Sequence, residues 1–149
     1  MKKTVSPEWN VTWKEYEPIY NRLLEIDARG RELRKVDGWQ KDKKIMDEIL
    51  SLLHEESALE DKAQDMRPRL IPEIGIPCTV YYYSDCSAGR IVAVPTPKTI
   101  VVKMDGLYHG TKTFTYRRDG SWTEKGTTLR DPGTYCALGY RYDYYDRSF

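Results

Sequence analysis

Cysteine, histidine and long apolar stretches are all scarce in this chain of 149 residues. Three cysteines are too few for a disulfide framework, and two histidines leave little material for metal or acid–base chemistry. No apolar stretch approaches the roughly 20 residues that span a bilayer. The beginning of the sequence has no apolar segment typical of a secretion signal. We therefore expect a cytoplasmic protein with no membrane partner.

An excess of charge of either sign is also missing, because 24 Lys and Arg balance 23 Asp and Glu, for a net charge of +1. This balance excludes a strongly basic nucleic-acid coat and an acidic mimic of nucleic acid, although a local charged patch remains compatible with it. Apolar residues make up 40% of the chain, which is enough for a buried core.

The two halves of the chain differ in composition. Only two glycines precede residue 75, whereas ten of the twelve tyrosines follow residue 80. Residues 67–77 contain three prolines, which end helix formation. We therefore predict a helical domain over residues 1–70 and a β-domain over residues 71–149.

The helical half contains two apolar patterns with helical spacing. Thr12 and Glu15 have the spacing of a capping box, while Ser6-Pro7 is a competing start. Pro18 either kinks the first helix or marks its beginning. The first apolar stripe consists of Trp13, Tyr16, Tyr20, Leu23 and Ile26, and the second of Ile45, Ile49, Leu52, Leu59, Ala63 and Met66.

The second stripe is close to a heptad, with Glu56 at one seam position. Two arrangements fit this pattern: a helical hairpin within one chain, and helix pairing between chains. The second arrangement predicts a homo-oligomer.

The second half alternates β-forming stretches with turn signals. We predict strands over residues 78–83, 89–94 and 99–104, a hairpin of residues 113–117 and 121–125, and a last strand over residues 135–142. Residues 84–89 are expected to form a polar turn. The predicted fold class is therefore α+β, with a helical hairpin followed by a small antiparallel β-barrel or curled sheet.

Catalytic patterns are weak, so we do not expect an enzyme. His54 lies in a charged helix, and His109 lies in a loop where it is a minor candidate for a functional role. Cys86 falls in the predicted polar turn, where it could be exposed, whereas Cys78 and Cys136 fall in strand patterns typical of a core. No spacing typical of a metal site or a phosphate loop is present, and no cofactor is expected.

Binding is better supported, because the β-half holds more tyrosine and tryptophan than a small core can bury. Exposed aromatic rings offer faces on which a nucleotide base can stack, and arginine can bind phosphate. Protein interfaces are also rich in these residue types. The candidate ligand-binding residues are Ser84, Asp85, Arg117, Arg118, Trp122, Lys125, Arg141 and Tyr145.

Within the last predicted strand, Tyr140, Tyr142 and Tyr144 share one face, which we expect the core to bury. Phe149 is then expected to anchor the end of the chain. Arg141, on the other face, is expected to bind an anion, and to lie beside Arg117 and Arg118 if the hairpin of residues 113–125 pairs with this strand. The alternative is a surface ion pair of Arg141 with Asp143 or Asp146.

Two resemblances to known families extend these interpretations. Residues 74–105, with a strand, a polar turn, and two further strands ending in Asp105-Gly106, resemble SH3-like barrels of the KOW and Tudor type. Such barrels bind nucleic acids or peptides. Residues 114–126 (FTYRRDGSWTEKG) and 138–149 (LGYRYDYYDRSF) resemble a small family of phage and prophage proteins without an established enzymatic activity.

The phage resemblance implies an accessory factor that counteracts bacterial immunity in the cytoplasm of the host cell. Together with the aromatic and arginine residues, it predicts a non-enzymatic protein that sequesters a nucleotide-type immune signal. Two alternatives remain: an SH3-like module that binds nucleic acid, and an inhibitor that docks directly on a host defence protein such as a CRISPR effector. The near-neutral charge favours a small ligand or a protein over a long duplex.

Overall fold

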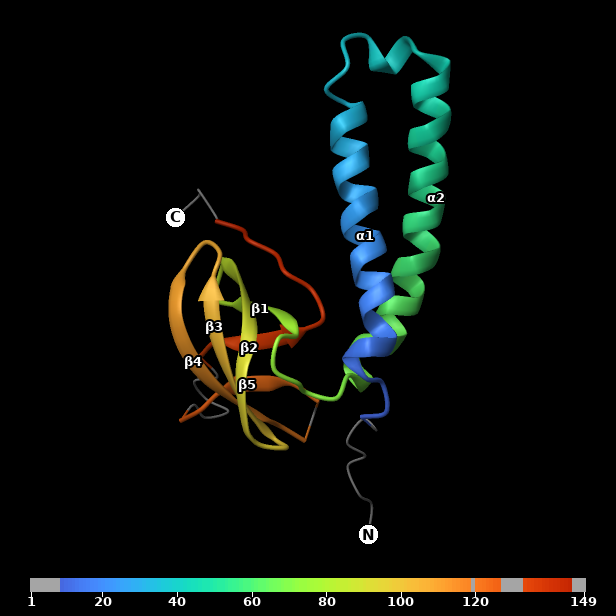
Figure 1. Ribbon diagram of the computed structural model, residues 1–149. Helices are drawn as coiled ribbons and strands as arrows, with labels where there is room; N and C mark the ends of the chain where they lie inside the picture. Colours follow the sequence, from blue (N-terminus) through green and yellow to red (C-terminus); the bar gives the residue numbers. More distant parts are fainter. Residues whose placement is uncertain (1–8, 119, 127–132, 146–149) are drawn as a thin grey trace. The chain divides into compact units, whose positions relative to one another are not determined.

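The computed structural model in Figure 1 describes residues 9–118, 120–126 and 133–145. The chain forms two compact units, residues 14–66 and residues 1–13 together with 67–149, and each is described by itself below. The fold is α+β, with two N-terminal helices followed by a closed antiparallel β-barrel, as the sequence predicted. No helix in the described ranges is long and apolar enough to cross a membrane.

The helical unit consists of α1 (Trp13–Leu33), a short 3₁₀ turn (Trp39–Lys41) and α2 (Lys43–Met66). α1 begins directly after Thr12, as the capping-box pattern predicts, and it continues through Pro18 instead of beginning there. Gly38 turns the chain between the helices with a φ of 73°, a conformation that glycine adopts without strain. Asp42 then accepts the amides of Lys44 at 3.0 Å and Ile45 at 3.2 Å, which caps the start of α2.

α1 and α2 pair with each other within one chain, so the hairpin alternative for the apolar stripes is confirmed. Arg22 donates to both carboxylate oxygens of Glu55, at 2.6 and 2.8 Å. Arg29 does the same with Glu48, at 2.6 and 3.1 Å. The hydrogen bonds from the guanidinium groups lower the pKa of both glutamates. Two ion pairs therefore link α1 to α2 along one edge of the hairpin.

The barrel contains six strands in the closed order β1-β2-β3-β4-β5-β6, and every neighbouring pair is antiparallel. β6 returns to pair with β1, so no sheet edge is left open between them. The strands are β1 (Pro77–Tyr81), β2 (Cys86–Thr96), β3 (Thr99–Asp105), β4 (His109–Tyr116), β5 (Trp122–Glu124) and β6 (Tyr135–Leu138).

The barrel core is built from apolar side chains that alternate along the strands. β3 illustrates this, because Ile100, Val102 and Met104 are buried while Lys103 between them is exposed. Cys78 and Cys136 are also buried, which confirms their prediction as core residues. Other large buried side chains of the barrel include Val80, Ile91, Phe114, Trp122 and Leu138.

The structure corrects the prediction of a polar turn at residues 84–89. β2 already begins at Cys86, and Cys86, Ser87 and Ala88 are all buried. Cys86 is thus not exposed, and burial raises the pKa of its thiol. The hydroxyl of Ser87 accepts the amide of Tyr108 at 2.9 Å, so this polar side chain is satisfied inside the barrel.

The last strand is also shorter than predicted. β6 ends at Leu138, because Gly139 adopts a φ of 97° and turns the chain out of the sheet. Tyr142 and Tyr144 are 54% and 48% exposed, so the core does not bury the face that Tyr140, Tyr142 and Tyr144 would have shared. Phe149, the expected anchor, lies outside the described residues.

Gly89 is a position where the barrel tolerates no side chain. A Cβ at Gly89 would lie 2.8 Å from the carbonyl oxygen of Lys103 and 3.1 Å from Val102 on the adjacent strand β3. We expect Gly89→Ala to lower the free energy of unfolding by about 1–3 kcal/mol, the usual cost of overpacking. Urea unfolding followed by circular dichroism measures this loss. A variant as stable as the parent chain would contradict the close approach of β2 and β3.

The residues before α1 belong to the barrel unit and not to the helical one. Val11 donates to the carbonyl of Arg69 at 3.0 Å and accepts the amide of Ile71 at 2.8 Å, forming a parallel bridge with Leu70. The boundary between the two units therefore differs from the predicted boundary at residue 70, because residues 9–13 pack with the barrel.

Candidate functional site

The eight candidate ligand-binding residues fall into three separate places in the barrel unit. Ser84 and Asp85 lie in the turn between β1 and β2. Arg117, Arg118, Trp122 and Lys125 lie on the β4–β5 hairpin, while Arg141 and Tyr145 lie in the segment that follows β6.

Arg141 does not lie beside Arg117. Thr99 and Asp105 are the two ends of β3; Thr99 pairs with the end of β4 that precedes Arg117, whereas Asp105 is the partner of Arg141. Six residues of strand separate these ends, which is about 20 Å. The expectation that Arg141 lies beside Arg117 is therefore wrong.

Arg141 is engaged with the barrel itself. Its guanidinium lies 2.7 Å from Asp105 and also donates to the carbonyl of Gly89 at 3.3 Å. Asp105 accepts from Arg90 as well, at 2.7 Å. Among the described residues, Asp105 is thus the ion-pair partner that the structure gives to Arg141, and Asp146 lies outside the described residues. A role of Arg141 in ligand binding stays a prediction.

The ion pairs with Arg141 and Arg90 lower the pKa of Asp105 below its usual value of 3.8. The stability that Asp105 contributes is therefore complete above pH 3.8 and is lost as the pH falls through the lowered pKa. We expect Asp105→Asn to have a lower urea midpoint than the parent chain at pH 6. The two midpoints should converge as the pH falls below 3.8 and through the lowered pKa, and a constant difference between them would contradict the lowered pKa.

Asp143 fastens the segment after β6 to the barrel. Its Oδ1 atom accepts the amides of Ala88 at 2.8 Å and Leu107 at 2.7 Å. Next to it, Tyr144 and Cys86 exchange two backbone hydrogen bonds, at 2.9 and 3.0 Å. These hydrogen bonds hold the segment after β6 against the start of β2 and the residues just before β4.

Asp85 also has a structural partner. Its carboxylate accepts the hydroxyl of Tyr108 at 2.5 Å, and this hydrogen bond raises the pKa of Tyr108 to about 12. Ser84 donates to the other oxygen of Asp85 at 3.5 Å. The contact joins the β1–β2 turn to the loop after β3, while Tyr83 between the two strands is 95% exposed.

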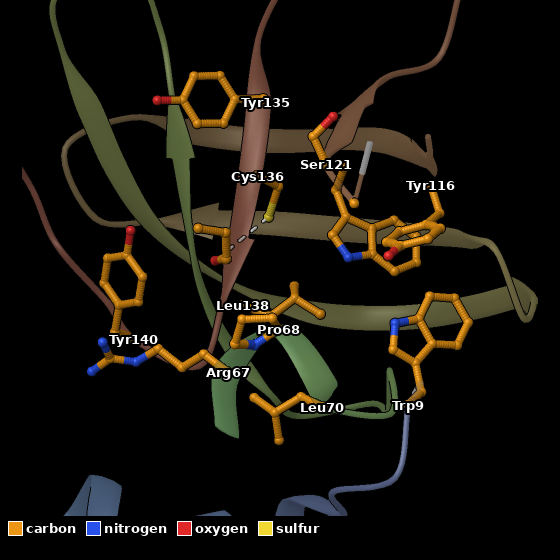
Figure 2. Close-up of a pocket in the computed structure, with 13 residues that line it drawn as sticks. Trp9, Arg67, Pro68, Leu70, Tyr116, Ser121, Tyr135, Cys136, Leu138 and Tyr140 are labelled. Carbon is orange, nitrogen blue, oxygen red and sulfur yellow. Dashed lines mark hydrogen bonds between the residues drawn. The ribbon is translucent and has the colours of Figure 1, made fainter. Parts of the chain in front are cut away.

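A cavity of about 290 Å³ opens on the barrel beside β5 and β6, and it is the best candidate for a ligand site. Figure 2 shows Trp9 and Tyr116 on one side of it and Arg67 and Tyr140 on the other, with Leu138 between them. The cavity is lined by Trp9, Arg67, Pro68, Leu70, Tyr116, Gly120, Ser121, Trp122, Tyr135, Cys136, Ala137, Leu138 and Tyr140.

The first wall of this cavity is a cluster of three aromatic rings. Trp9 stacks on Trp122 with ring centroids 5.8 Å apart and an interplanar angle of 10°. Tyr116 meets Trp9 at 4.7 Å in an edge-on arrangement and Trp122 at 5.0 Å in a tilted one. Trp122 is buried, so the cluster is a rigid apolar surface supported by the core.

The second wall combines tyrosines with an arginine. Tyr81 stacks on Tyr135 with centroids 4.9 Å apart, and the hydroxyls of Tyr81 and Tyr140 share a hydrogen bond. Burial, followed by this hydrogen bond, raises the pKa of Tyr81. The guanidinium of Arg67 lies 5.0 Å from the centroid of the Tyr140 ring, within cation–π distance.

Of the candidate residues, only Trp122 lines this cavity. Arg117 and Arg118 belong to the β4–β5 turn, whose residues Gly120 and Ser121 do line it. Arg117 donates to Thr123 at 2.6 Å, and Lys125 is exposed at the end of β5. The hairpin thus borders the cavity, whereas Ser84, Asp85 and Arg141 are held elsewhere by the contacts described above.

Trp9, Arg67 and Tyr140 were not predicted from the sequence as lining residues of this cavity. They come from three distant segments, and only the fold brings them together. A tryptophan just before a capping-box pattern was a usable signal for Trp9, because such a residue precedes the helix and can pack elsewhere. Arg67, inside the proline-rich boundary, offered no signal.

The two histidines, His54 and His109, are both exposed, and no cluster of three His, Cys, Asp or Glu side chains suited to a metal exists among the residues that the structure describes. The comparisons with known proteins add no function, because neither a family model, nor a curated protein, nor a solved structure matches this chain. The cavity is therefore the feature on which a function must rest.

Proposed function

We propose that this chain is a non-enzymatic binding protein that takes a nucleotide-type ligand in the cavity between Trp9 and Tyr140. The observation that carries the proposal is the lining: aromatic rings form both walls, and Arg67 is the only charged residue among the described residues that line it. Base–aromatic stacking contributes about 1–3 kcal/mol per base. Arg67 supplies two parallel donors for a phosphate.

The sign of the charge argues against the other common use of an aromatic cluster. Aromatic cages bind methylated lysine or choline through cation–π attraction. The positive side chain of Arg67 in the lining repels such cations. The volume of about 290 Å³ is at the lower end for small-molecule sites, which suits one base with its sugar.

Binding of a nucleotide is tested directly by calorimetry with a panel of mononucleotides, cyclic nucleotides, ADP-ribose and short DNA and RNA strands. Tryptophan fluorescence on the same samples should change on binding and keep changing in a Trp39→Phe control, because Trp39 lies in the helical unit. Absence of heat and of a fluorescence change at millimolar concentrations of every compound would overturn the proposal. Binding of the strands alone would favour the nucleic-acid alternative.

The resemblance to phage and prophage proteins supports a biological role for this ligand. We propose that the ligand is a nucleotide-type signal of bacterial immunity, which the protein sequesters in the host cell. Bacteria that carry a nucleotide-signalling defence and express the chain should become sensitive to phage again. Continued resistance with an expressed, folded protein that binds the signal would overturn this role while leaving the ligand site intact.

A second candidate function is docking on a host defence protein. The observation that favours it is a group of exposed aromatic side chains, Tyr83, Tyr142, Tyr144 and Tyr145, with exposed fractions of 48–95%. Tyrosine is enriched in the central residues of protein interfaces. Purified defence protein should then bind the chain without nucleotide, and Tyr83→Ser together with Tyr145→Ser should abolish that binding.

A further inference from the structure

α2 carries a second apolar row beside the one that packs on α1. Met46, Leu50 and Leu53 follow each other at spacings of four and three, so they lie on one side of the helix. Leu50 and Leu53 are 49% and 45% exposed. Exposed leucines in a row of this kind mark a contact surface more often than isolated ones do.

This row borders the seam with α1, and Leu50 lies outside that seam. Ile49 is buried, and Glu48 and Glu55 form ion pairs with α1, so the seam lies on their side of α2. Leu50 directly follows Ile49, and its side chain therefore leaves the helix about 100° away from it. Leu53 also lines a hollow of about 190 Å³ together with Ile26 and Gly30, so this end of the row lies at the border with α1.

We propose that a second copy of this chain covers this row, with the two α2 helices antiparallel across a twofold axis. Continuing the row in both directions gives Lys43 before Met46, and Ser57 and Glu60 after Leu53. When the axis passes between residues 50 and 53, Leu50 lies against the partner's Leu53 and Met46 lies against the partner's Ser57.

Charge complementarity selects this arrangement. In the antiparallel register Lys43 lies against the partner's Glu60 at both ends of the contact, which spans about 26 Å of helix. A parallel register would place Lys43 against the partner's Lys43 and Glu60 against the partner's Glu60. The two hairpins then form a four-helix bundle, in which each row becomes part of a shared core.

Light scattering coupled to size-exclusion chromatography tests the dimer on the full chain, whose monomer mass is 17.5 kDa. We expect a mass near twice this value at micromolar concentration, and a monomer for Leu50→Glu with unchanged helical circular dichroism. Leu24→Glu is the matched control, because Leu24 is 51% exposed but lies on α1. It should remain dimeric. A monomeric parent chain at all concentrations would overturn the proposal, as would a dimer that Leu50→Glu leaves intact.

A charge exchange tests the register. Lys43→Glu and Glu60→Lys should each raise the dissociation constant several-fold, and the double variant should restore it. If the dissociation constant of the double variant is raised by as much as the two single effects combined, the antiparallel register is wrong. The dimer does not depend on the nucleotide, so failure of this test leaves the proposed ligand site unaffected, and failure of the ligand test leaves the dimer unaffected.

Discussion

Trp9→Ala is expected to weaken nucleotide binding by about 5- to 150-fold, because it removes one stacking surface worth about 1–3 kcal/mol. The ring of Trp9 stacks on Trp122 and contacts Tyr116, so its loss also opens the first wall of the cavity. Calorimetric titration at a temperature where the variant is folded measures the effect.

Trp39→Ala is the control for this change. Trp39 is half-buried like Trp9, but it lies in the helical unit beside Arg34. Its replacement should leave the affinity unchanged. If Trp9→Ala binds as tightly as the parent chain, then Trp9 has no part in the site and the ligand must use other residues.

Asp143→Ala is expected to lower the free energy of unfolding by about 3 kcal/mol, because the carboxylate accepts two backbone amides and each charged hydrogen bond contributes about 1.5–3 kcal/mol. The expected loss lies at the lower end of the combined range for the two hydrogen bonds, because Asp143 is exposed. Urea unfolding measures the loss.

Gly106→Ala should reproduce much of this effect without touching the carboxylate. A Cβ at Gly106 would lie 2.2 Å from Oδ1 of Asp143, so the two cannot occupy their places together. The double variant should therefore be only slightly less stable than Asp143→Ala alone. Full additivity of the two losses would show that Gly106 does not make room for Asp143.

The architecture was accessible from the sequence where local patterns and burial agree. The stripe that contains Tyr16 and Ile26 predicted α1, and the turn pair at residues 105–106 predicted the end of β3. The number of short strands predicted a small antiparallel barrel or a curled sheet, and the structure shows the closed barrel. These features depend on periodicity and turn chemistry, which are properties of neighbouring residues.

Errors arose where small or polar residues are buried. Ser87 and Ala88 were assigned to a polar turn by composition, yet both are buried in β2. In the last segment, alternation of tyrosines suggested a strand, but Gly139 turns the chain away after Leu138. Tertiary context overrides local preference at both places.

The candidate site was harder to predict, because a cavity is assembled from distant segments. Trp122 was identified by its residue type, whereas Trp9 and Arg67 owe their position to the bridge between Val11 and Leu70. Arg141 was assigned to an anion on the strength of its chemistry, and the structure gives it Asp105 as a partner. Residue type predicts what a side chain can bind, but not which group lies next to it.

The bridge between Val11 and Leu70 also makes the helical hairpin an insertion in the barrel unit, since the chain leaves and re-enters that unit at two adjacent points. Such an excursion is modular: residues 14–66 are replaceable by a short glycine-rich connector that joins residue 13 to residue 67. A truncation that simply removes residues 1–66 is a different experiment, because it also deletes Trp9 and the bridge. Evolution is equally free to lengthen, shorten or exchange the hairpin while the aromatic cavity stays in place.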